Sequence, residues 1–299
     1  METLLQHLPQ SARPAPAAPL PMRLNGGFSH PQMSRFIAEV ERRYRRDDID
    51  SFWELEDEFR QLVQSDAVLQ FLRQELAQMV ETPARIGQWR PNQLIIHRGR
   101  GFALSVWMVE QERRYIHSTS FLGMCAPIGA DCLDYAIYKL PPDYRNSMFD
   151  PAVKLEPAGT GLTAPGGVLL LQSKQYAYDF QGTRPQPVLK FATASFEPME
   201  WLFSKDSLQA WQANDSELVW TQLRVAAYVL GRLADESSRA PLEQLSSHPN
   251  HAVRWAVIQS LGRLSRSAVM PKLETAINDP HPHIRRAAAR TLQQLALTQ

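Results

Sequence analysis

The sequence has little of what many specialised protein classes require. Its two cysteines, Cys125 and Cys132, are too few for a disulfide framework or for a zinc site made of four cysteines. The longest apolar runs, such as residues 168–171, are far too short to span a bilayer. No Gly-x-Gly-x-x-Gly pattern and no phosphate-loop lysine motif occurs, so nothing supports nucleotide chemistry.

Charge and histidine content are equally restrictive. The chain has 32 Lys and Arg against 31 Asp and Glu, and its formal net charge of +1 gives no overall field that would attract nucleic acid. Residues 1–22 show no basic segment followed by an apolar stretch, so we expect a cytoplasmic protein without membrane contact. Of the eight histidines, only His97 and His117 lie between residues 85 and 200.

A length of 299 residues is enough for two domains with additional terminal segments. Residues 1–24 are rich in proline and alanine, and five prolines between residues 9 and 21 exclude a helix, so we expect a disordered tail. Residues 25–84 carry apolar side chains at spacings of three and four, which predicts a helical segment packed on the next domain. Ser51 and Glu54 fit a capping box that opens the second of its three helices.

Residues 85–198 have a different character. Short β-branched or aromatic runs are separated by glycines, which predicts an all-β sandwich or barrel. The runs cover residues 93–97, 102–109, 114–118, 133–140, 168–172, 176–180 and 188–194.

From about residue 199 to residue 299 we expect helices that repeat. Val253-Arg254-Trp255-Ala256 and Ile284-Arg285-Arg286-Ala287 stand 31 residues apart, and so do Leu261 and Leu292. A period of 30–31 residues in helix pairs is typical of a solenoid. Residues 216–297 resemble HEAT repeats of the short bacterial kind, and this resemblance implies a module that presents a helical surface to a protein or peptide partner.

The β region also resembles a known superfamily. Tyr115-Ile116-His117, Gly129 before the run at 133–140, and Pro165-Gly166-Gly167-Val168 are similar to a cupin, and within that superfamily to the thiol dioxygenases. The resemblance implies a β-barrel or jelly roll of cupin type. With the predicted N-terminal helices and the C-terminal α-solenoid of HEAT-like helix pairs, we expect an α+β multidomain protein.

In the dioxygenases the first of these segments supplies a His-x-His pair and a later strand supplies a third histidine, which together hold Fe(II). This sequence keeps His117 but has Thr119 at the second position, and Gln175 and Tyr176 near the third. His97 is the one other histidine of the β region, so His117 and His97 are the candidate metal ligands. A site with one carboxylate would also need one of four side chains, namely Glu110, Glu112, Asp131 or Asp134.

We expect no cofactor, with Fe(II) at a rebuilt site as the alternative. The corresponding functional hypotheses are a binding or accessory protein, whose barrel takes a small ligand, and a non-haem-iron oxygenase acting on a small or peptidyl substrate. The candidate ligand-binding residues are His117, Tyr115, Tyr135, Tyr176, Tyr178 and Gln175.

The predicted interaction surface of the repeats carries Arg254, Arg285 and Arg286. From residue 215 onward there are ten Lys and Arg and seven Asp and Glu, an excess of three positive charges. Because the arginine that follows Val or Ile belongs to the repeat pattern itself, we expect it to brace the neighbouring unit. A nucleic-acid partner is therefore not expected, and a protein or peptide partner is.

Overall fold

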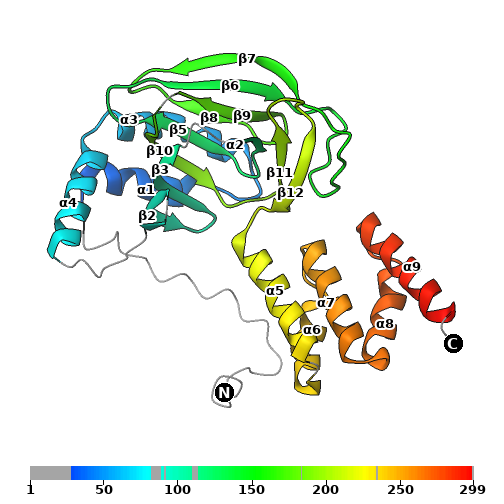
Figure 1. Cartoon of the computed structure of the whole chain (residues 1–299). Coiled ribbons are helices and arrows are strands. Elements are labelled where there is room, and N and C mark those ends of the chain that lie inside the picture. Colours follow the sequence, from blue (N-terminus) through cyan, green and yellow to red (C-terminus); the bar gives the residue numbers. More distant parts are fainter. Residues whose placement is uncertain are drawn as a thin grey trace.

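The computed structural model describes residues 28–81, 89–90, 92–109, 114–182, 184–233 and 235–297. The predicted tail at residues 1–24 lies outside these ranges. Figure 1 shows three successive parts: a group of helices, two β-sheets that face each other, and an array of helices that leads to the C-terminal end. The predicted fold class, an α+β multidomain protein with this order of parts, is confirmed. Among the described residues, no helix is both long and apolar enough to cross a bilayer.

The N-terminal part contains α1 (Pro31–Arg43), α2 (Asp50–Trp53), α3 (Glu56–Val63) and α4 (Ala67–Glu81). The helix α1 begins where His30 Nδ1 accepts a hydrogen bond from the Gln32 amide and where Pro31 takes the first helical position. Its buried side chains recur at helical spacing, so one face of the helix packs inward.

The capping box predicted at residue 51 is wrong. The Ser51 hydroxyl accepts a hydrogen bond from the Arg45 amide at 2.9 Å and donates one to the Asp48 carbonyl at 2.6 Å. Ser51 therefore closes the preceding turn instead of capping a helix. The predicted second helix is divided into α2 and α3, with a break at Glu54 and Leu55.

The β region forms two six-stranded antiparallel sheets. The first sheet has the order β1-β2-β3-β10-β5-β8 and the second β12-β11-β4-β9-β6-β7. The strands are β1 (Trp89–Arg90), β2 (Gln93–Gly99), β3 (Phe102–Val109), β4 (Tyr115–Ser118), β5 (Gly123–Pro127), β6 (Leu133–Lys139), β7 (Glu156–Thr163), β8 (Leu169–Leu171), β9 (Tyr176–Gln181), β10 (Gln186–Thr193), β11 (Met199–Ser204) and β12 (Ala210–Asp215).

The expectation of helix from residue 199 onward is wrong, because β11 and β12 continue the second sheet up to Asp215. The run Trp201-Leu202-Phe203 is short and fully apolar, and such a run suits a buried strand as well as a buried helix. Pairing with β4 decides between them, since Leu202 lies opposite His117 and Phe203 opposite Ile116.

Each sheet face has its own apolar partner. Helices α1, α2, α3 and α4 cover the outer face of the first sheet, where Phe191 of β10 contacts the rings of Phe36, Phe52 and Phe59. The inner face of this sheet meets the second sheet in a separate cluster that includes Cys125. Residues 140–155 pack over the outer face of the second sheet.

The C-terminal array contains α5 (Leu218–Leu233), the short 3₁₀ helix η3 (Glu236–Ser238), α6 (Arg239–Leu245), α7 (His251–Leu264), α8 (Arg266–Ala276) and α9 (Pro282–Leu297). Asn250 caps α7 by accepting hydrogen bonds from the amides of Ala252 and Val253, and Ser265 caps α8. These helices share one apolar core of their own. The array therefore supplies its own hydrophobic stabilisation, as stacked repeats must.

The array is also tied to the sheets. Only two residues separate β12 from α5, and the nearly buried carboxylate of Asp215 accepts a hydrogen bond from Arg224 at 2.7 Å. The ring of His281 donates its Nε2 proton to the Ser147 carbonyl at 2.9 Å, which links α9 to the loop over the second sheet. The array is thus held to the β domain both at α5 and at the turn before α9.

Candidate functional site

A cavity of about 270 Å³ lies between the two sheets, and we call it the central cavity. Both sheets contribute to its wall. Its lining includes four aromatic side chains, one of them a tyrosine, and three further ionisable side chains: His117, Lys190 and Glu200. The other lining residues are Trp107, Ser118, Thr119, Phe121, Leu171, Tyr178 and Phe180.

Strand alternation aims these side chains inward. In β10, Leu189 and Phe191 pack toward the helices, so Lys190 between them points to the opposite face, into the space between the sheets. In the second sheet, His117 lies directly opposite Tyr178 of β9 and opposite Leu202 of β11. Glu200 is two residues before Leu202, so it shares the inner face with His117.

His117 and Glu200 form a hydrogen-bonded pair, with 3.0 Å between Nδ1 and Oε1. Because a carboxylate only accepts, Nδ1 carries the shared proton, and Nε2 is the ring nitrogen left for a second hydrogen bond. This is the arrangement in which a carboxylate fixes the orientation and tautomer of an imidazole. The pair offers the cavity one oriented nitrogen for a ligand hydrogen bond.

Lys190 supplies the positive charge of the cavity. Its Nζ lies 4.9 Å from the ring centroid of Trp107 and 5.0 Å from that of Phe121. Both distances fall within the range of cation–π attraction, which holds the ammonium group between two ring faces. These contacts place a cation in the wall of the central cavity.

The Cys125 thiol, close to the cavity, and the Tyr178 hydroxyl both have raised pKa values. Burial raises the pKa of the Cys125 thiol to about 12, although the Lys190 charge acts in the opposite direction. The Tyr178 hydroxyl donates to the Leu170 carbonyl and accepts from the Gln172 amide, while burial raises its pKa. Neither group is set up as a nucleophile or a base at neutral pH.

Of the residues predicted to bind a ligand, the structure brings His117 and Tyr178 to the central cavity. Tyr135 and Tyr176 pack on the edge of the apolar cluster between the sheets, and Tyr115 stacks on Trp211 with 6.2 Å between centroids. The remaining prediction, Gln175, is exposed in the turn between β8 and β9, where its backbone carbonyl accepts a hydrogen bond from the Leu140 amide.

The two candidate metal ligands are not together. A β-bulge between Ile95 and His97 shifts the register of β2, so that His97 pairs with Leu104 and shares its helix-facing side. There His97 lies 3.7 Å from Glu41 of α1 and packs on the ring of Phe102. Burial lowers the pKa of His97, with Glu41 acting in the opposite direction, which suits a neutral core histidine.

The described residues do not fit a mononuclear iron site. No group of three His, Cys, Asp or Glu side chains within the described part of the chain is placed to hold a metal ion. Asp131 and Asp134, two of the four candidates for the one carboxylate ligand, are exposed, and the other two lie outside the described residues. In the central cavity His117 is bonded to Glu200, and the Lys190 cation would repel a metal ion.

In the helical array, two arginines of the predicted interaction surface act as internal braces. Arg254 donates both to the Asp279 carboxylate, at 2.7 and 2.8 Å, and to the carbonyls of residues 248 and 249. Arg285, 31 residues later, donates to the carbonyls of residues 279 and 280. Burial would raise the pKa of Asp279, but hydrogen bonds from Arg254 and the His281 amide hold it below its usual value. Arg286 is exposed.

A second hollow lies in the array, between α7, α8 and α9. It has a volume of about 440 Å³ and an apolar wall that includes Trp255 and Leu295.

Residues 220–293 match the family model of HEAT repeats. We refer to this match as the HEAT-repeat region. It covers about a quarter of the chain, and it confirms the predicted repeats over α5 to α9 without assigning the β domain to a family.

No curated protein matches the chain. Among solved structures, a hydroquinone 1,2-dioxygenase in complex with Cd²⁺ and 4-hydroxybenzonitrile is 14% identical, with 38% of this chain and 71% of that chain covered and a TM-score of 0.28. A sugar phosphate isomerase of the cupin superfamily from Silicibacter pomeroyi is 10% identical, with 44% and 82% covered and a TM-score of 0.22. A vicilin from Solanum melongena is 12% identical, with 47% and 36% covered and a TM-score of 0.24.

None of these TM-scores reaches 0.5, so the neighbours establish no shared fold, and the cupin type of the barrel stays a prediction. Lys190 and Glu200, which give the cavity its chemistry, were missed from the sequence. Lys190 is the one charged residue in the run Val188-Leu189-Lys190-Phe191-Ala192, and a charge at an inward position of a buried strand is a usable signal. Glu200 was missed because residues 199–204 were expected to be helical.

Proposed function

We propose that this chain is a binding or accessory protein that holds a small organic anion between its sheets and a protein or peptide partner on its HEAT-repeat region. One observation carries the first part: the Lys190 ammonium group lies between two aromatic rings and shares the central cavity with the His117–Glu200 pair. A cation held beside aromatic rings in a cavity favours a ligand with a negative group.

The dimensions and lining narrow the class of ligand. A volume of about 270 Å³ is below the range of about 300–1,000 Å³ that drug-sized ligands occupy, so the ligand is small. Its carboxylate or phosphate group would lie against Lys190, and a second polar group would form a hydrogen bond with Nε2 of His117. A flat or branched apolar body would contact Trp107 and Phe180.

The second part rests on the repeats. HEAT units expose long helical surfaces, and their usual use is to bind other proteins or peptides. The hollow between α7, α8 and α9 shows that the stack offers more than a flat surface.

A thermal-shift screen of the full chain tests the ligand. The panel contains small aromatic and aliphatic carboxylates and phosphate esters. A ligand at one hundred times its Kd adds about 2.7 kcal/mol to the free energy of unfolding, enough to raise Tm by several degrees. We expect Lys190→Met to abolish the shift and the matched variant Lys139→Met, at an exposed lysine, to keep it. A panel without any stabilising compound, or a shift that survives in Lys190→Met, would refute the proposal.

The oxygenase alternative predicts a different outcome. It requires an iron site built around His117, for which the described residues offer no three-ligand set. Protein purified without chelators is analysed for metal. Stoichiometric iron that is lost in His117→Ala would overturn the binding-protein proposal in favour of the oxygenase.

A further inference from the structure

Two helix–helix contacts that occupy the same place in successive repeats differ in how closely the helices approach each other. Gly231 of α5 and Gly262 of α7 stand 31 residues apart, as do Ser260 of α7 and Thr291 of α9. At the first contact, a Cβ placed on Gly231 would lie 2.7 Å from Ser260 Cβ and 2.8 Å from its Cα, so the two helices meet at their backbones. At the second contact, Gly262 and Thr291 line the hollow instead of touching.

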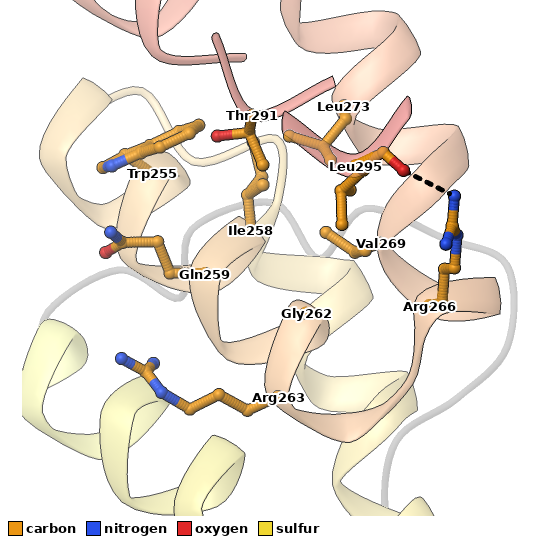
Figure 2. A pocket seen from close by; sticks show the side chains of 10 residues that line it. All are labelled: Trp255, Ile258, Gln259, Gly262, Arg263, Arg266, Val269, Leu273, Thr291 and Leu295. Carbon is orange, nitrogen blue, oxygen red and sulfur yellow. Dashed lines mark hydrogen bonds between the residues drawn. The ribbon is translucent and has the colours of Figure 1, made fainter. Parts of the chain in front are cut away.

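Gly262 therefore has room for a Cβ. The nearest atom to a Cβ placed there is Cγ2 of Val269 at 3.6 Å, an ordinary van der Waals distance. The repeat is closed between α5 and α7 and open between α7 and α9. Figure 2 shows the open contact, with Gly262 at the centre of the lining residues.

The wall of this hollow is apolar, with polar groups at its margin. Ile258, Val269 and Leu273 are buried, and Trp255 and Leu295 are half-buried beside them. Another hollow, of about 290 Å³, shares Trp255 and Gln259 with the 440 Å³ hollow and reaches Arg224 of α5. The two hollows therefore adjoin along one face of α7, and we call them together the repeat groove.

All charged side chains that line the repeat groove are arginines: Arg224, Arg263 and Arg266, with no carboxylate among them. Arg224 is paired with Asp215. Arg263 lies over the ring of Tyr228 at 5.0 Å, and Arg266 donates to the Leu295 carbonyl at 3.2 Å. Within the described part of the chain, Arg263 and Arg266 make no ion pair, and both are exposed.

The two exposed arginines lie at different edges of the apolar wall. In Figure 2, Arg263 extends from α7 toward the helices at the lower left, while Arg266 stands at the opposite side beside Leu295. A ligand whose apolar group enters between them has a guanidinium group on each side. Such a groove matches a peptide that carries carboxylates on both sides of an apolar side chain, because guanidinium groups pair well with carboxylates.

We infer that the repeat groove binds a segment of a partner protein in which a bulky apolar side chain is flanked on both sides by Asp or Glu. This inference rests on the proposed interaction role of the HEAT-repeat region and names the chemistry of its partner. The apolar side chain fills the space that Gly262 and Thr291 leave open, and the flanking carboxylates pair with Arg263 and Arg266. Burial of an apolar group beside Trp255 supplies affinity, and the arginines supply orientation and selectivity.

The test is selection of a random twelve-residue peptide library displayed on phage against the immobilised full chain. We expect enriched peptides to combine an aromatic or branched aliphatic residue with Asp or Glu on both sides. Fluorescence polarisation of the most enriched peptide then measures Kd for the variants. Arg263→Glu with Arg266→Glu should raise Kd at least about tenfold, and so should Thr291→Trp, which fills the hollow. The matched control, Arg232→Glu with Arg290→Glu, changes the same charge outside the groove lining and should stay within about twofold.

Three results would overturn the inference. Enrichment of basic or charge-free peptides, or no enrichment, contradicts the charge argument. An unchanged Kd in Thr291→Trp contradicts the location. Tighter binding of a labelled twenty-nucleotide DNA than of the peptide, lost with the same arginines, would assign the groove to nucleic acid. If no peptide binds but the Lys190-dependent thermal shift remains, the groove inference fails and the ligand part of the proposed function stands. If peptide binding depends only on Arg285 and Arg286, the groove inference fails and the interaction role of the repeats stands.

Discussion

Burial separates the chemistry of the two thiols. Cys125 is fully buried between the sheets and its pKa is raised to about 12, whereas Cys132 is half-buried. We expect iodoacetamide at pH 8 to label Cys132 in the native protein and to label both cysteines after denaturation, because the thiolate is the reactive form. Mass spectrometry of the tryptic peptides checks this. Native labelling of Cys125 at the rate of Cys132 would contradict this account, because it would show an accessible, ionised thiol between the sheets.

A second prediction at this scale uses two equivalent glycines. Gly231→Ala would place a Cβ against the backbone of Ser260, and we expect it to lower the free energy of unfolding by about 1–3 kcal/mol. Gly262→Ala has room for its Cβ and should be neutral or stabilising by up to about 1 kcal/mol, since alanine favours the helix. Denaturant unfolding followed by circular dichroism measures both. Equal effects of the two substitutions would contradict the difference between the closed and the open contact.

At the scale of elements, the arginine braces hold successive units in register. Arg254 joins the turn before α7 to Asp279 in the turn before α9, and both side chains are nearly buried. Removing one partner leaves the other charge unpaired, so Arg254→Ala should lower the free energy of unfolding by about 3 kcal/mol. Arg239→Ala, which breaks exposed pairs within one unit, serves as control and should change stability little. An Arg254→Ala protein as stable as the control would mean that the brace contributes nothing.

The contact between the array and the β domain should weaken in acid. The rings of His251 and His281 stack with 3.7 Å between centroids, and His281 bonds to Ser147. Burial lowers the pKa of His251 to about 4, with further lowering from His281, Arg254 and His283 and an opposing effect of Asp215. Burial likewise lowers the pKa of His281.

The direction in which stability changes with pH follows from comparison with the unfolded chain, whose histidines titrate near pH 6.5. Between pH 6.5 and about 4 the unfolded state takes up a proton that the folded His251 does not. The contribution of His251 to stability is therefore fully present above this window and is lost as the pH drops through it. Melting temperatures of the wild type and of His251→Gln, measured from pH 7.5 to 4.5, test this. The variant should lose less stability over the window, and parallel curves would contradict the account.

Some elements were readable from the sequence because their pattern is local. The run at 188–194 is short and mostly apolar, and the 31-residue repeat of Arg254 and Arg285 reflects a bracing contact made within each unit. The strand β7, Glu156–Thr163, was not predicted, since its glycines and proline are those of a turn and its stability comes from pairing with β6. The intrinsic strand propensities of the residues therefore predict little for such an edge strand, because pairing with the neighbouring strand decides its structure.

At the scale of the whole molecule, the central cavity depends on pairings that no local pattern reveals. His117 and Tyr178 were predicted because each lies in a readable strand. Lys190 reaches the cavity because β10 inserts between β3 and β5, and Glu200 because β11 pairs with β4, about 80 residues earlier in the chain. These pairings join segments far apart in sequence. They also separate His97 from His117, which the histidine count alone had grouped together.

The central claim is that the molecule binds a small anion through Lys190. Isothermal titration of the most stabilising compound from the screen into wild type, Lys190→Met and Lys139→Met tests it most directly. Methionine retains the apolar stem between Trp107 and Phe121 and removes the charge. The account predicts one site per chain, a Kd raised at least about tenfold in Lys190→Met, and no change in Lys139→Met. Equal Kd values in all three proteins would contradict it.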